Sequence, residues 1–241
     1  MGEHKFIIVE LVNGFLRWLL GTFGLAVEKG KDVVPSHIVM AVLVVLLIII
    51  FFKLTVKRLD IFPGKMQYML ELIYKFFQKL VDDMMGHEGR KFIPVLTTLG
   101  LFIGISNLLG LLPELGSPTA NLNTTVGCAI FIFFYYHYQG VKKHGLWGYI
   151  KTFLGPVWWL AWLFLPIEIV SHISRPLSLS MRLYGNIFGE DMVIIIIATY
   201  LFSFVAPLPV MALAMFTSLL QAFIFVMLST IYLAGAMAEE H

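Results

Sequence analysis

The chain has 241 residues, of which 59% are hydrophobic and only 13% are charged. Soluble domains carry roughly 25% charged residues, so this composition excludes an ordinary soluble globular protein and predicts helices that face lipid. Near-balanced charges, 17 Lys and Arg against 15 Asp and Glu, give no sign of a nucleic-acid partner. The single Cys128 cannot form an internal disulfide, and the sequence indicates no metal site and no cofactor.

The first 30 residues predict an interfacial segment and not a cleavable signal peptide. Glu10, Asn13 and Arg17 interrupt the apolar stretch. Because Glu10 and Arg17 are seven residues apart, they lie on one side of a helix. We therefore expect an amphipathic helix near residues 5–26 that lies in the membrane interface.

Three apolar runs predict membrane spans in the first 140 residues. Their boundaries are 33–56, 92–112 and 121–139. A basic, amphipathic connection over residues 53–91 separates the first two, and Lys142 and Lys143 open an interfacial helix expected at 142–155. Positively charged loops stay on the cytoplasmic side, so we expect these two connections inside and the 113–120 loop and the N-terminus outside.

The C-terminal part is predicted to form a membrane hairpin. Pro207 and Pro209 separate two long helices, expected at 156–205 and 208–238, because proline disrupts a helix interior. The first is longer than a perpendicular crossing needs, so we expect a strong tilt. The fold class predicted is a single all-α, polytopic membrane domain with five transmembrane helices, interfacial helices and a cytoplasmic C-terminus.

One face of the first hairpin helix is polar along its length. Its members are spaced alternately by three and four residues: Glu168, Ser171, Arg175, Ser178, Arg182, Gly185 and Gly189. We call this face the polar stripe. Hydrocarbon would penalise an arginine by about 2.5–3.5 kcal/mol, so the stripe is expected to face protein or water.

Arg182 is the deepest charge of the polar stripe. No acid stands within one helical turn of it, and because arginine keeps its proton it forms a fixed positive charge. Gln221 on the return helix is expected to face Arg182 across the hairpin, an interhelical amide bond without a transport role being the alternative. For Glu168 and Arg175, pairing with each other or with a lipid headgroup is an equally good interpretation.

The run Arg175-Pro-Leu-Ser-Leu-Ser-Met-Arg182-Leu-Tyr-Gly-Asn186, followed by Gln221-Ala-Phe-Ile-Phe, resembles subunit a of the F-type ATP synthase. Three further stretches are similar in the same order: Pro63–Glu71, Pro118–Thr125 and Tyr232–His241. The resemblance implies a stator subunit that wraps a rotating ring of carboxylate-bearing hairpins and provides two offset aqueous half-channels. It also implies a peripheral-stalk partner, a bacterial plasma membrane location and no catalysis by this subunit alone.

The resemblance assigns roles to individual residues. Arg182 matches the essential arginine that separates the half-channels, and Asn186 and Gln221 match its polar neighbours. The positions that match the cytoplasmic half-channel are Glu168, Ser171, Arg175 and Ser178.

Three positions depart from the family pattern. The outer acid, commonly glutamate, is here Asp191, and Glu190 precedes it, so either one could take the proton. Ala214 stands where some members have histidine, and Asn121 where some have aspartate.

Other membrane functions were weighed against this interpretation. His87-Glu88 lacks the second histidine of a metalloprotease helix, and the scattered histidines do not favour a haem carrier. No inverted repeat indicates a secondary transporter. An ion channel without a rotor is the strongest alternative, and the sequence does not identify the coupling ion.

Overall fold

The computed structural model describes residues 7–22, 32–56, 64–112, 115–154, 159, 161–200 and 207–238. These residues form seven α-helices and two 3₁₀ helices, in the order α1 (Ile7–Thr22), α2 (Ser36–Thr55), α3 (Lys65–Met85), η1 (Gly86–Phe92), α4 (Ile93–Gly110), η2 (Pro118–Ala120), α5 (Leu122–Leu154), α6 (Ala161–Tyr200) and α7 (Pro207–Met237). No strand occurs among the described residues, so the prediction of an all-α protein is confirmed.

Four helical stretches of the described residues are long and apolar enough to cross a membrane: Ser36–Thr55, Lys65–Gly110, Trp162–Tyr200 and Leu208–Met237. They confirm the prediction of an integral membrane protein. The third predicted span lies in α5, which is not one of the four because uncharged polar residues at both ends of the span, such as Asn123, His137 and Gln139, lower its mean hydropathy. Five crossings is therefore an approximate number.

The basic connection of residues 53–91 contains more regular structure than the sequence suggested. Most of it forms α3, an amphipathic helix that packs against α4 and α7 through the buried side chains of Phe77 and Val81. At its end, the Arg90 guanidinium donates two hydrogen bonds of 2.9 Å to the Asp82 carboxylate. The bidentate pair fixes the corner where η1 leads into α4.

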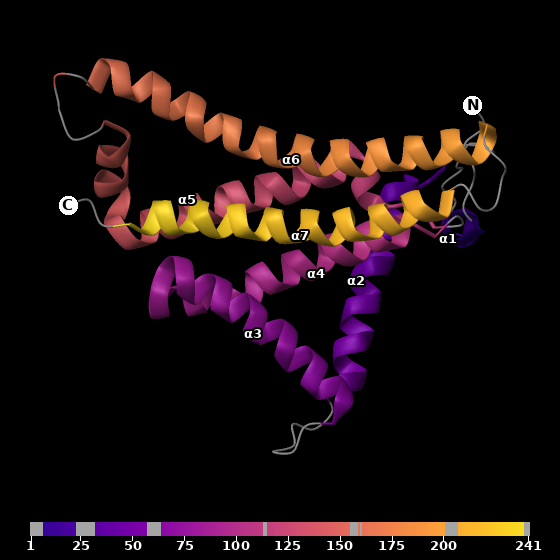
Figure 1. Cartoon of the computed structure of the whole chain (residues 1–241). Coiled ribbons are helices and arrows are strands. Elements are labelled where there is room, and N and C mark those ends of the chain that lie inside the picture. Colours follow the sequence, from indigo (N-terminus) through magenta and orange to yellow (C-terminus); the bar gives the residue numbers. More distant parts are fainter. Residues whose placement is uncertain are drawn as a thin grey trace.

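The long hairpin and α2 run in very different directions (Figure 1). α4, α5, α6 and α7 pack along one another, whereas α2 crosses their common direction steeply. α2 and the hairpin therefore cannot both be perpendicular to the membrane, as expected for a strongly tilted hairpin. α6 contains Pro166 and Pro176 and bends along its length in Figure 1, because each proline removes a helical hydrogen bond.

The core lies where α4 meets α7 at close range. Gly100 approaches Val226, and Gly104 approaches Ala222 one turn along, so the two helices run antiparallel with small residues at the contact. A methyl group at Gly100 would lie 2.9 Å from Val226 Cγ2 and 2.8 Å from Phe77 Cζ. In lipid the hydrophobic effect does not drive helices together, and close packing at small residues stabilises their association instead.

α5 is bent sharply near its end. Gly145 has a φ of 73°, a left-handed conformation that residues with a Cβ adopt at a cost. The bend turns the chain back so that the Tyr149 ring lies against Gly140, where a Cβ would clash with the ring. The segment beyond the bend contains the interfacial helix expected at 142–155, whose interfacial position stays a prediction.

α1 is joined to the segment before α2 by a side-chain clamp. The Asn13 side chain is buried, accepts a hydrogen bond from Val34 N (2.9 Å) and donates one to Val34 O (3.2 Å). Leu11, Phe15 and Trp18 are exposed on one side of α1. This apolar face fits the predicted interfacial position, which stays a prediction.

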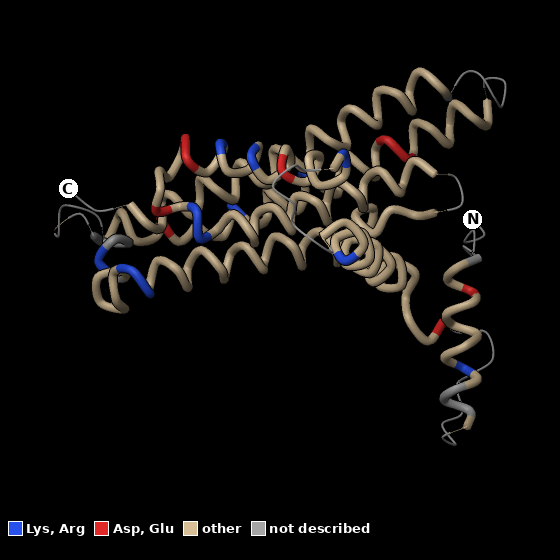
Figure 2. The backbone as a smooth tube through the Cα atoms, turned by 90° about the horizontal axis from the view of Figure 1, so that it is seen from below, with Lys and Arg blue, Asp and Glu red and all other residues tan. Residues whose placement is uncertain are grey.

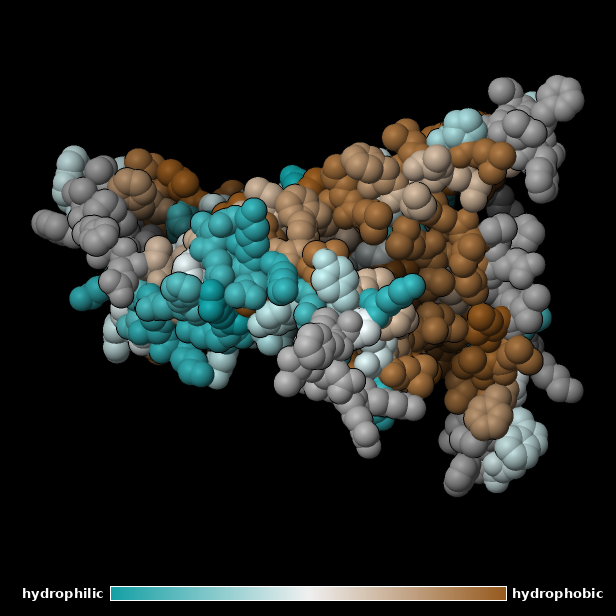
Figure 3. All heavy atoms as spheres, turned by 60° about the horizontal axis from the view of Figure 1, so that its bottom comes forward, coloured by the Kyte–Doolittle hydropathy of each residue, from teal (hydrophilic) through white to brown (hydrophobic). Residues whose placement is uncertain are grey.

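Charges and apolar side chains are separated over the surface. Apart from those of α1, most charged residues lie in the half of the bundle near the C-terminus (Figure 2). In Figure 3 a broad hydrophobic surface adjoins a hydrophilic patch on the same face. Near the C-terminus, Lys143 Nζ donates to Met237 O (2.8 Å) and lies 3.7 Å from Glu88 Oε2, which ties the end of α7 to α5 and η1.

Candidate functional site

The polar stripe of α6 divides into two environments. Glu168, Ser171 and Arg175 are half-buried against neighbouring helices, whereas Ser178 and Arg182 are exposed on the surface of the chain. The stripe was expected to face protein or water. The part from Glu168 to Arg175 contacts other helices of this chain, and the part around Arg182 is exposed on the surface of α6.

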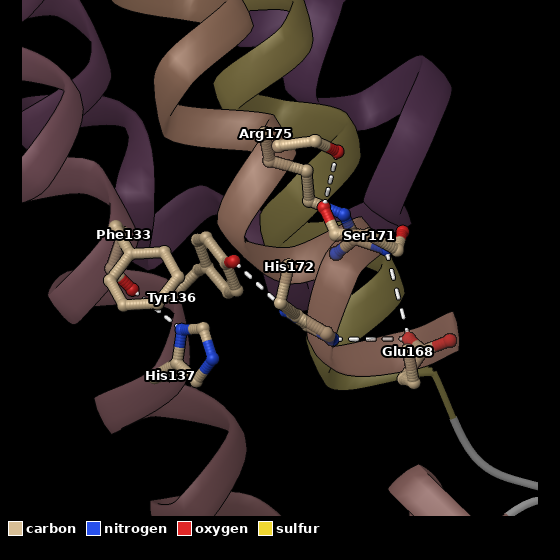
Figure 4. Close-up of polar contacts among 8 residues, drawn as sticks. Phe133, Tyr136, His137, Glu168, Ser171, His172 and Arg175 are labelled. Carbon is tan, nitrogen blue, oxygen red and sulfur yellow. Dashed lines mark hydrogen bonds and ion pairs between the residues drawn. The ribbon is translucent and has the colours of Figure 1, made fainter. Parts of the chain in front are cut away.

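At its first part, the stripe meets α5 in a polar cluster around His172 (Figure 4). His172 Nε2 lies 3.1 Å from Glu168 Oε1, and His172 Nδ1 lies 3.0 Å from the Tyr136 hydroxyl. Next to these groups, the His137 ring makes an edge contact with the His172 ring at a centroid distance of 5.0 Å. We call Tyr136, His137, Glu168, His172 and Arg175 the inner cluster.

Arg175 completes the charge balance of the inner cluster. Its Nη2 lies 4.0 Å from Glu168 Oε1, and its guanidinium lies over the Tyr232 ring of α7, 5.3 Å from the centroid. A guanidinium over an aromatic face is attracted by the ring quadrupole. Pairing of Glu168 with Arg175, which the sequence left as one of two interpretations, is therefore present at long range, together with the closer contact to His172.

A small cavity of about 120 Å³ adjoins the inner cluster. Its lining consists of Glu168, His172 and Arg175 from α6, Tyr149 from beyond the bend of α5, and Gly235, Ala236 and Ala238 from the C-terminal end of α7 and just beyond it. Burial raises the pKa of the Tyr149 phenol, which lies outside the predicted spans. The cavity is large enough for several waters and is lined by groups that bind them.

Sequence reasoning missed the α5 side of this cluster. Tyr136, His137 and Tyr149 were not singled out, and His172 was given no role. The available signal was the pairing of a tyrosine and a histidine within an apolar span, since buried polar rings need partners. Their partners could not be known, because the contact depends on how α5 packs on α6.

Arg182 has no hydrogen-bond or ion-pair partner among the described residues, and its side chain is exposed. Along the stripe its exposed neighbours are Ser178 and Gly185, and exposed apolar side chains such as Met181 and Leu177 lie on adjoining faces of α6. A lone guanidinium in a membrane helix is expensive unless it meets an anionic group or water. This geometry makes Arg182 available to a group from outside the chain.

Beyond Arg182, α6 is joined to α7 by polar side chains. Asn186 Nδ2 donates to Gln221 Oε1 at 2.8 Å, and Gln221 is only 1% exposed. This is an interhelical amide bond, as in the alternative interpretation, and Asn186 lies one turn from Arg182 along α6. That Gln221 faces Arg182 stays a prediction. The Gln221 Nε2 amide is buried without a partner among the described residues.

The two adjacent acids differ in their contacts. Thr217 Oγ1 of α7 donates to Glu190 Oε1 at 2.5 Å. Asp191 is half-buried and has no hydrogen-bond or ion-pair partner among the described residues. Neighbouring residues of a helix differ by about 100°, so the two carboxylates point in different directions from α6. We call Asn186, Gln221, Thr217, Glu190 and Asp191 the outer cluster.

A buried network, also missed from the sequence, fixes α7 next to the outer cluster. Asn107 Nδ2 of α4 donates to the Ser218 carbonyl at 3.2 Å, and Thr119 of η2 donates to Asn107 Oδ1 at 2.6 Å. Ser117 lies 2.6 Å from the Thr119 hydroxyl. Because Ser218 lies between Thr217 and Gln221 in the sequence, this network holds the turn of α7 that carries both.

No group of three or more His, Cys, Asp or Glu side chains that could hold a metal ion occurs in the described part of the chain. The side chains of the two clusters are a guanidinium, carboxylates, imidazoles, amides and hydroxyls, all of which hydrogen-bond water.

Comparisons with known proteins agree on one family. The family model described as ATP synthase A chain matches residues 38–234. ATP synthase subunit a of Desulfosudis oleivorans is 45% identical over 205 residues, which cover 85% of this chain and 89% of the relative.

Two further relatives match over more of the chain. ATP synthase subunit a 1 of Syntrophotalea carbinolica is 42% identical over 230 residues, 94% of this chain and 97% of the relative. ATP synthase subunit a of Geobacter sulfurreducens is 40% identical over 227 residues, 94% of this chain and 96% of the relative.

Proposed function

The chain belongs to the ATP synthase subunit a family, and from this premise we propose that it is the proton-translocating stator subunit of the membrane sector. Two aqueous half-channels, one from each side of the membrane, lead protons to and from the carboxylates of a rotating ring. Each proton that crosses the membrane supplies about 2.3 kcal/mol per 100 mV of membrane potential. Rotation carries this work to the catalytic part of the complex.

The observation that supports this mechanism best is the position of Arg182. Its guanidinium is exposed and unpaired among the described residues, with the inner cluster on one side along α6 and the outer cluster on the other. A ring carboxylate is neutral in lipid, because desolvation penalises its charge, and ionises beside a fixed guanidinium. Arg182 therefore makes the carboxylate release its proton and blocks direct passage between the half-channels.

The two clusters are assigned to the two half-channels. Glu168, Ser171, Arg175 and Ser178 serve the cytoplasmic half-channel. Asn186, Gln221, Glu190 and Asp191 serve the outer one. Glu190 contacts α7 through Thr217, whereas Asp191 occupies the family position, and we propose that the two acids share the proton traffic as a coupled pair.

The partners follow from the same assignment. The exposed middle of the polar stripe, around Arg182, faces the ring of hairpin subunits, and the remaining apolar surface meets lipid and a peripheral-stalk subunit. The protein lies in a bacterial plasma membrane with its N-terminus outside and its C-terminus in the cytoplasm. Labelling of Lys142 or Lys143 by an impermeant amine reagent from the outer face would contradict this orientation.

Substitution of Arg182 tests the proposed function. Lysine keeps the charge but loses its proton readily when buried and lacks the planar fork that holds a carboxylate. We expect Arg182→Lys to abolish coupled ATP synthesis in an assembled complex, and Arg182→Ala to let protons leak through the membrane sector without its catalytic head. Passive proton flux into vesicles measures the leak, with sodium varied to identify the coupling ion.

Two results would overturn the assignment. One is an Arg182→Lys complex that synthesises ATP at nearly the wild-type rate. The other is an Arg182→Ala membrane sector as tight to protons as the wild type. Copurification of the ring subunits with each variant is the control for assembly, and absence of a ring from the wild-type preparation would favour a channel without a rotor.

A further inference from the structure

We propose that His172 and Tyr136 are positioning residues of the cytoplasmic half-channel, which fix one oxygen of Glu168 and leave the other free to exchange protons with water. The inference rests on the proposed function, because it names what prepares Glu168 for its task. It concerns side chains of two helices, His172 on α6 and Tyr136 on α5, to which the sequence gave no role. The contacts are drawn in Figure 4.

Hydrogen-bond chemistry fixes the direction of the chain from Tyr136 to Glu168. An ionised carboxylate only accepts, so His172 Nε2 carries a proton and donates it to Glu168 Oε1, 3.1 Å away. Neutral histidine then has an unprotonated Nδ1, which accepts from the Tyr136 hydroxyl at 3.0 Å. Tyr136 therefore selects the tautomer of His172, and His172 orients the carboxylate.

The contacts leave the two oxygens of Glu168 unequal. Oε1 receives both the His172 contact and the Arg175 guanidinium, at 3.1 Å and 4.0 Å. Oε2 has no partner among the described residues, and the Glu168 side chain is 38% exposed beside the cavity of about 120 Å³. In Figure 4 this second oxygen points away from His172. Oε2 is therefore the oxygen that takes a proton from water or returns it.

Packing makes His172 rigid enough to hold this position. Its side chain is 12% exposed, and its ring stacks on the Tyr136 ring and meets the edge of His137. His137 is itself tied to its own helix, with Nδ1 2.8 Å from the Phe133 carbonyl. An imidazole held on both nitrogens and on its faces cannot turn away from Glu168 without breaking several contacts.

Other titratable and charged groups surround Glu168 and must be considered in any pH measurement. α6 contributes His172 and Arg175, α5 contributes Tyr136, His137 and Tyr149, and α7 contributes Tyr232. Arg175 and the tyrosines keep one charge state near neutral pH. The two histidines are therefore the surrounding groups that can themselves change charge near neutral pH.

The transport test uses the whole complex in vesicles and varies pH separately on each side. Tyr136→Phe removes one hydroxyl and keeps the ring, His172→Leu removes the donor, and His172→Gln restores a donor to Glu168. We expect Tyr136→Phe and His172→Leu to move the midpoint of the cytoplasmic-side pH profile of ATP synthesis by about 0.5 pH unit or more. His172→Gln should move it less, and none should move the outer-side profile.

Tyr138→Phe is the matched control. Tyr138 lies two residues along the same helix and is 61% exposed, and no hydrogen bond joins it to Glu168 or His172 among the described residues. It should leave both profiles unchanged. A loss of rate without a shift of the cytoplasmic-side midpoint, or an equal shift on both sides, would overturn the positioning role, because a merely structural defect produces either result.

Two further measurements separate this inference from the proposed function. Nitrogen-15 NMR of histidine-labelled complex should show His172 with its proton on Nε2, and Tyr136→Phe should shift the Nδ1 signal; a proton on Nδ1 would overturn the inference. Glu168→Gln reports on the proposed function instead. If Glu168→Gln alters the cytoplasmic-side profile and Tyr136→Phe does not, only the positioning pair fails, and if neither does, the proposed half-channel fails.

Discussion

The inner and outer clusters hold carboxylates in opposite ways. In the inner cluster, Glu168 contacts an imidazole and a guanidinium, and aromatic rings from α5 and α7 enclose the group. In the outer cluster, Glu190 and Asp191 have no cation partner among the described residues, and their neighbours are a hydroxyl and amides. At the inner cluster the charge of Glu168 is balanced by Arg175, whereas at the outer cluster no cation among the described residues balances Glu190 and Asp191.

This difference has a physical consequence for proton movement. In the proposed function, protons pass beside a fixed cation in the inner cluster and between two neighbouring acids in the outer cluster. Arg182 lies between the two clusters along α6 and has no partner among the described residues, so its guanidinium is available to a group from outside the chain.

Among variants of the two clusters, removal of both outer acids should have the largest effect. We expect the double variant Glu190→Gln, Asp191→Asn to lower proton-driven ATP synthesis about 100-fold, since general acid–base groups contribute roughly 10²–10⁴-fold to proton transfer. Each single variant should retain part of the rate if the two acids share the proton. Initial rates of ATP synthesis in vesicles with an imposed proton gradient measure all three.

The single variants also assign the acids. A larger loss in Asp191→Asn than in Glu190→Gln favours the family position, and the reverse favours the acid that contacts Thr217. Thr217→Val tests the contact with Glu190 separately from the carboxyl group, because it removes the hydroxyl bonded to Glu190 and keeps the side-chain shape. Wild-type rates in both single variants and in the double variant would exclude both acids from the mechanism.

The packing of α4 on α7 holds the outer cluster directly, through Asn107 and Ser218. Gly100→Ala would place a methyl group 2.8 Å from Phe77 Cζ and 2.9 Å from Val226 Cγ2, an overpacking that costs about 1–3 kcal/mol. We expect α7 to shift, so that complexes assemble with lower thermal stability and lower ATP synthesis. The hydrogen bonds from Tyr136 through His172 to Glu168 join α5 and α6 only, so the midpoint of the cytoplasmic-side pH profile should change less than it does in Tyr136→Phe.

Gly104→Ala is the control for this prediction. It lies one turn along the same helix face, and its added methyl group would be 3.6 Å from Ala222 Cβ, an ordinary contact distance. Its thermal stability should stay within about 0.5 kcal/mol of the wild type. Equal destabilisation by the two substitutions would show that the close approach at Gly100 is not what holds α7.

The amide pair of the outer cluster should respond asymmetrically to substitution. Gln221 is buried, whereas Asn186 is exposed. Asn186→Leu leaves the Gln221 amide buried with no partner, at a cost of about 1–3 kcal/mol, while Gln221→Leu leaves Asn186 able to find water. We expect the larger loss of thermal stability in Asn186→Leu. An equal loss, measured on purified complex, would contradict the pairing.

The sequence predicted the membrane class, the hairpin and the family, and these predictions are confirmed. The reason is that they depend on local properties, namely the length of apolar runs, the prolines at the turn and the RPLSLS run. The resemblance to subunit a needed no knowledge of packing, because it depends only on which residues follow one another along the chain.

Contacts between helices could not be predicted in the same way. The hydrogen bond between Asn186 and Gln221 is one such contact. Which residue of α6 lies opposite Gln221 depends on how far α7 is shifted along α6, and that position is set partly by the contact of α4 with α7. Tyr136 and Asn107 were missed for the same reason, as their partners lie 36 and 111 residues away. The pattern of apolar and polar residues does not indicate which residues so far apart in the chain come into contact.

The smallest effect is expected at Arg175, and it sharpens the contrast with Arg182. Arg175 lies 4.0 Å from Glu168 and its side chain is 28% exposed, so water can replace much of what the guanidinium supplies. Partly exposed ion pairs contribute about 0.2–1 kcal/mol, and the contact with Tyr232 adds a similar amount. We therefore expect Arg175→Ala to lower ATP synthesis only about two- to fivefold, with Arg175→Lys milder still, in assays run beside Arg182→Ala. A defect in Arg175→Ala as severe as that of Arg182→Ala would mean that both arginines act as one unit and that the inner cluster is part of the barrier to protons.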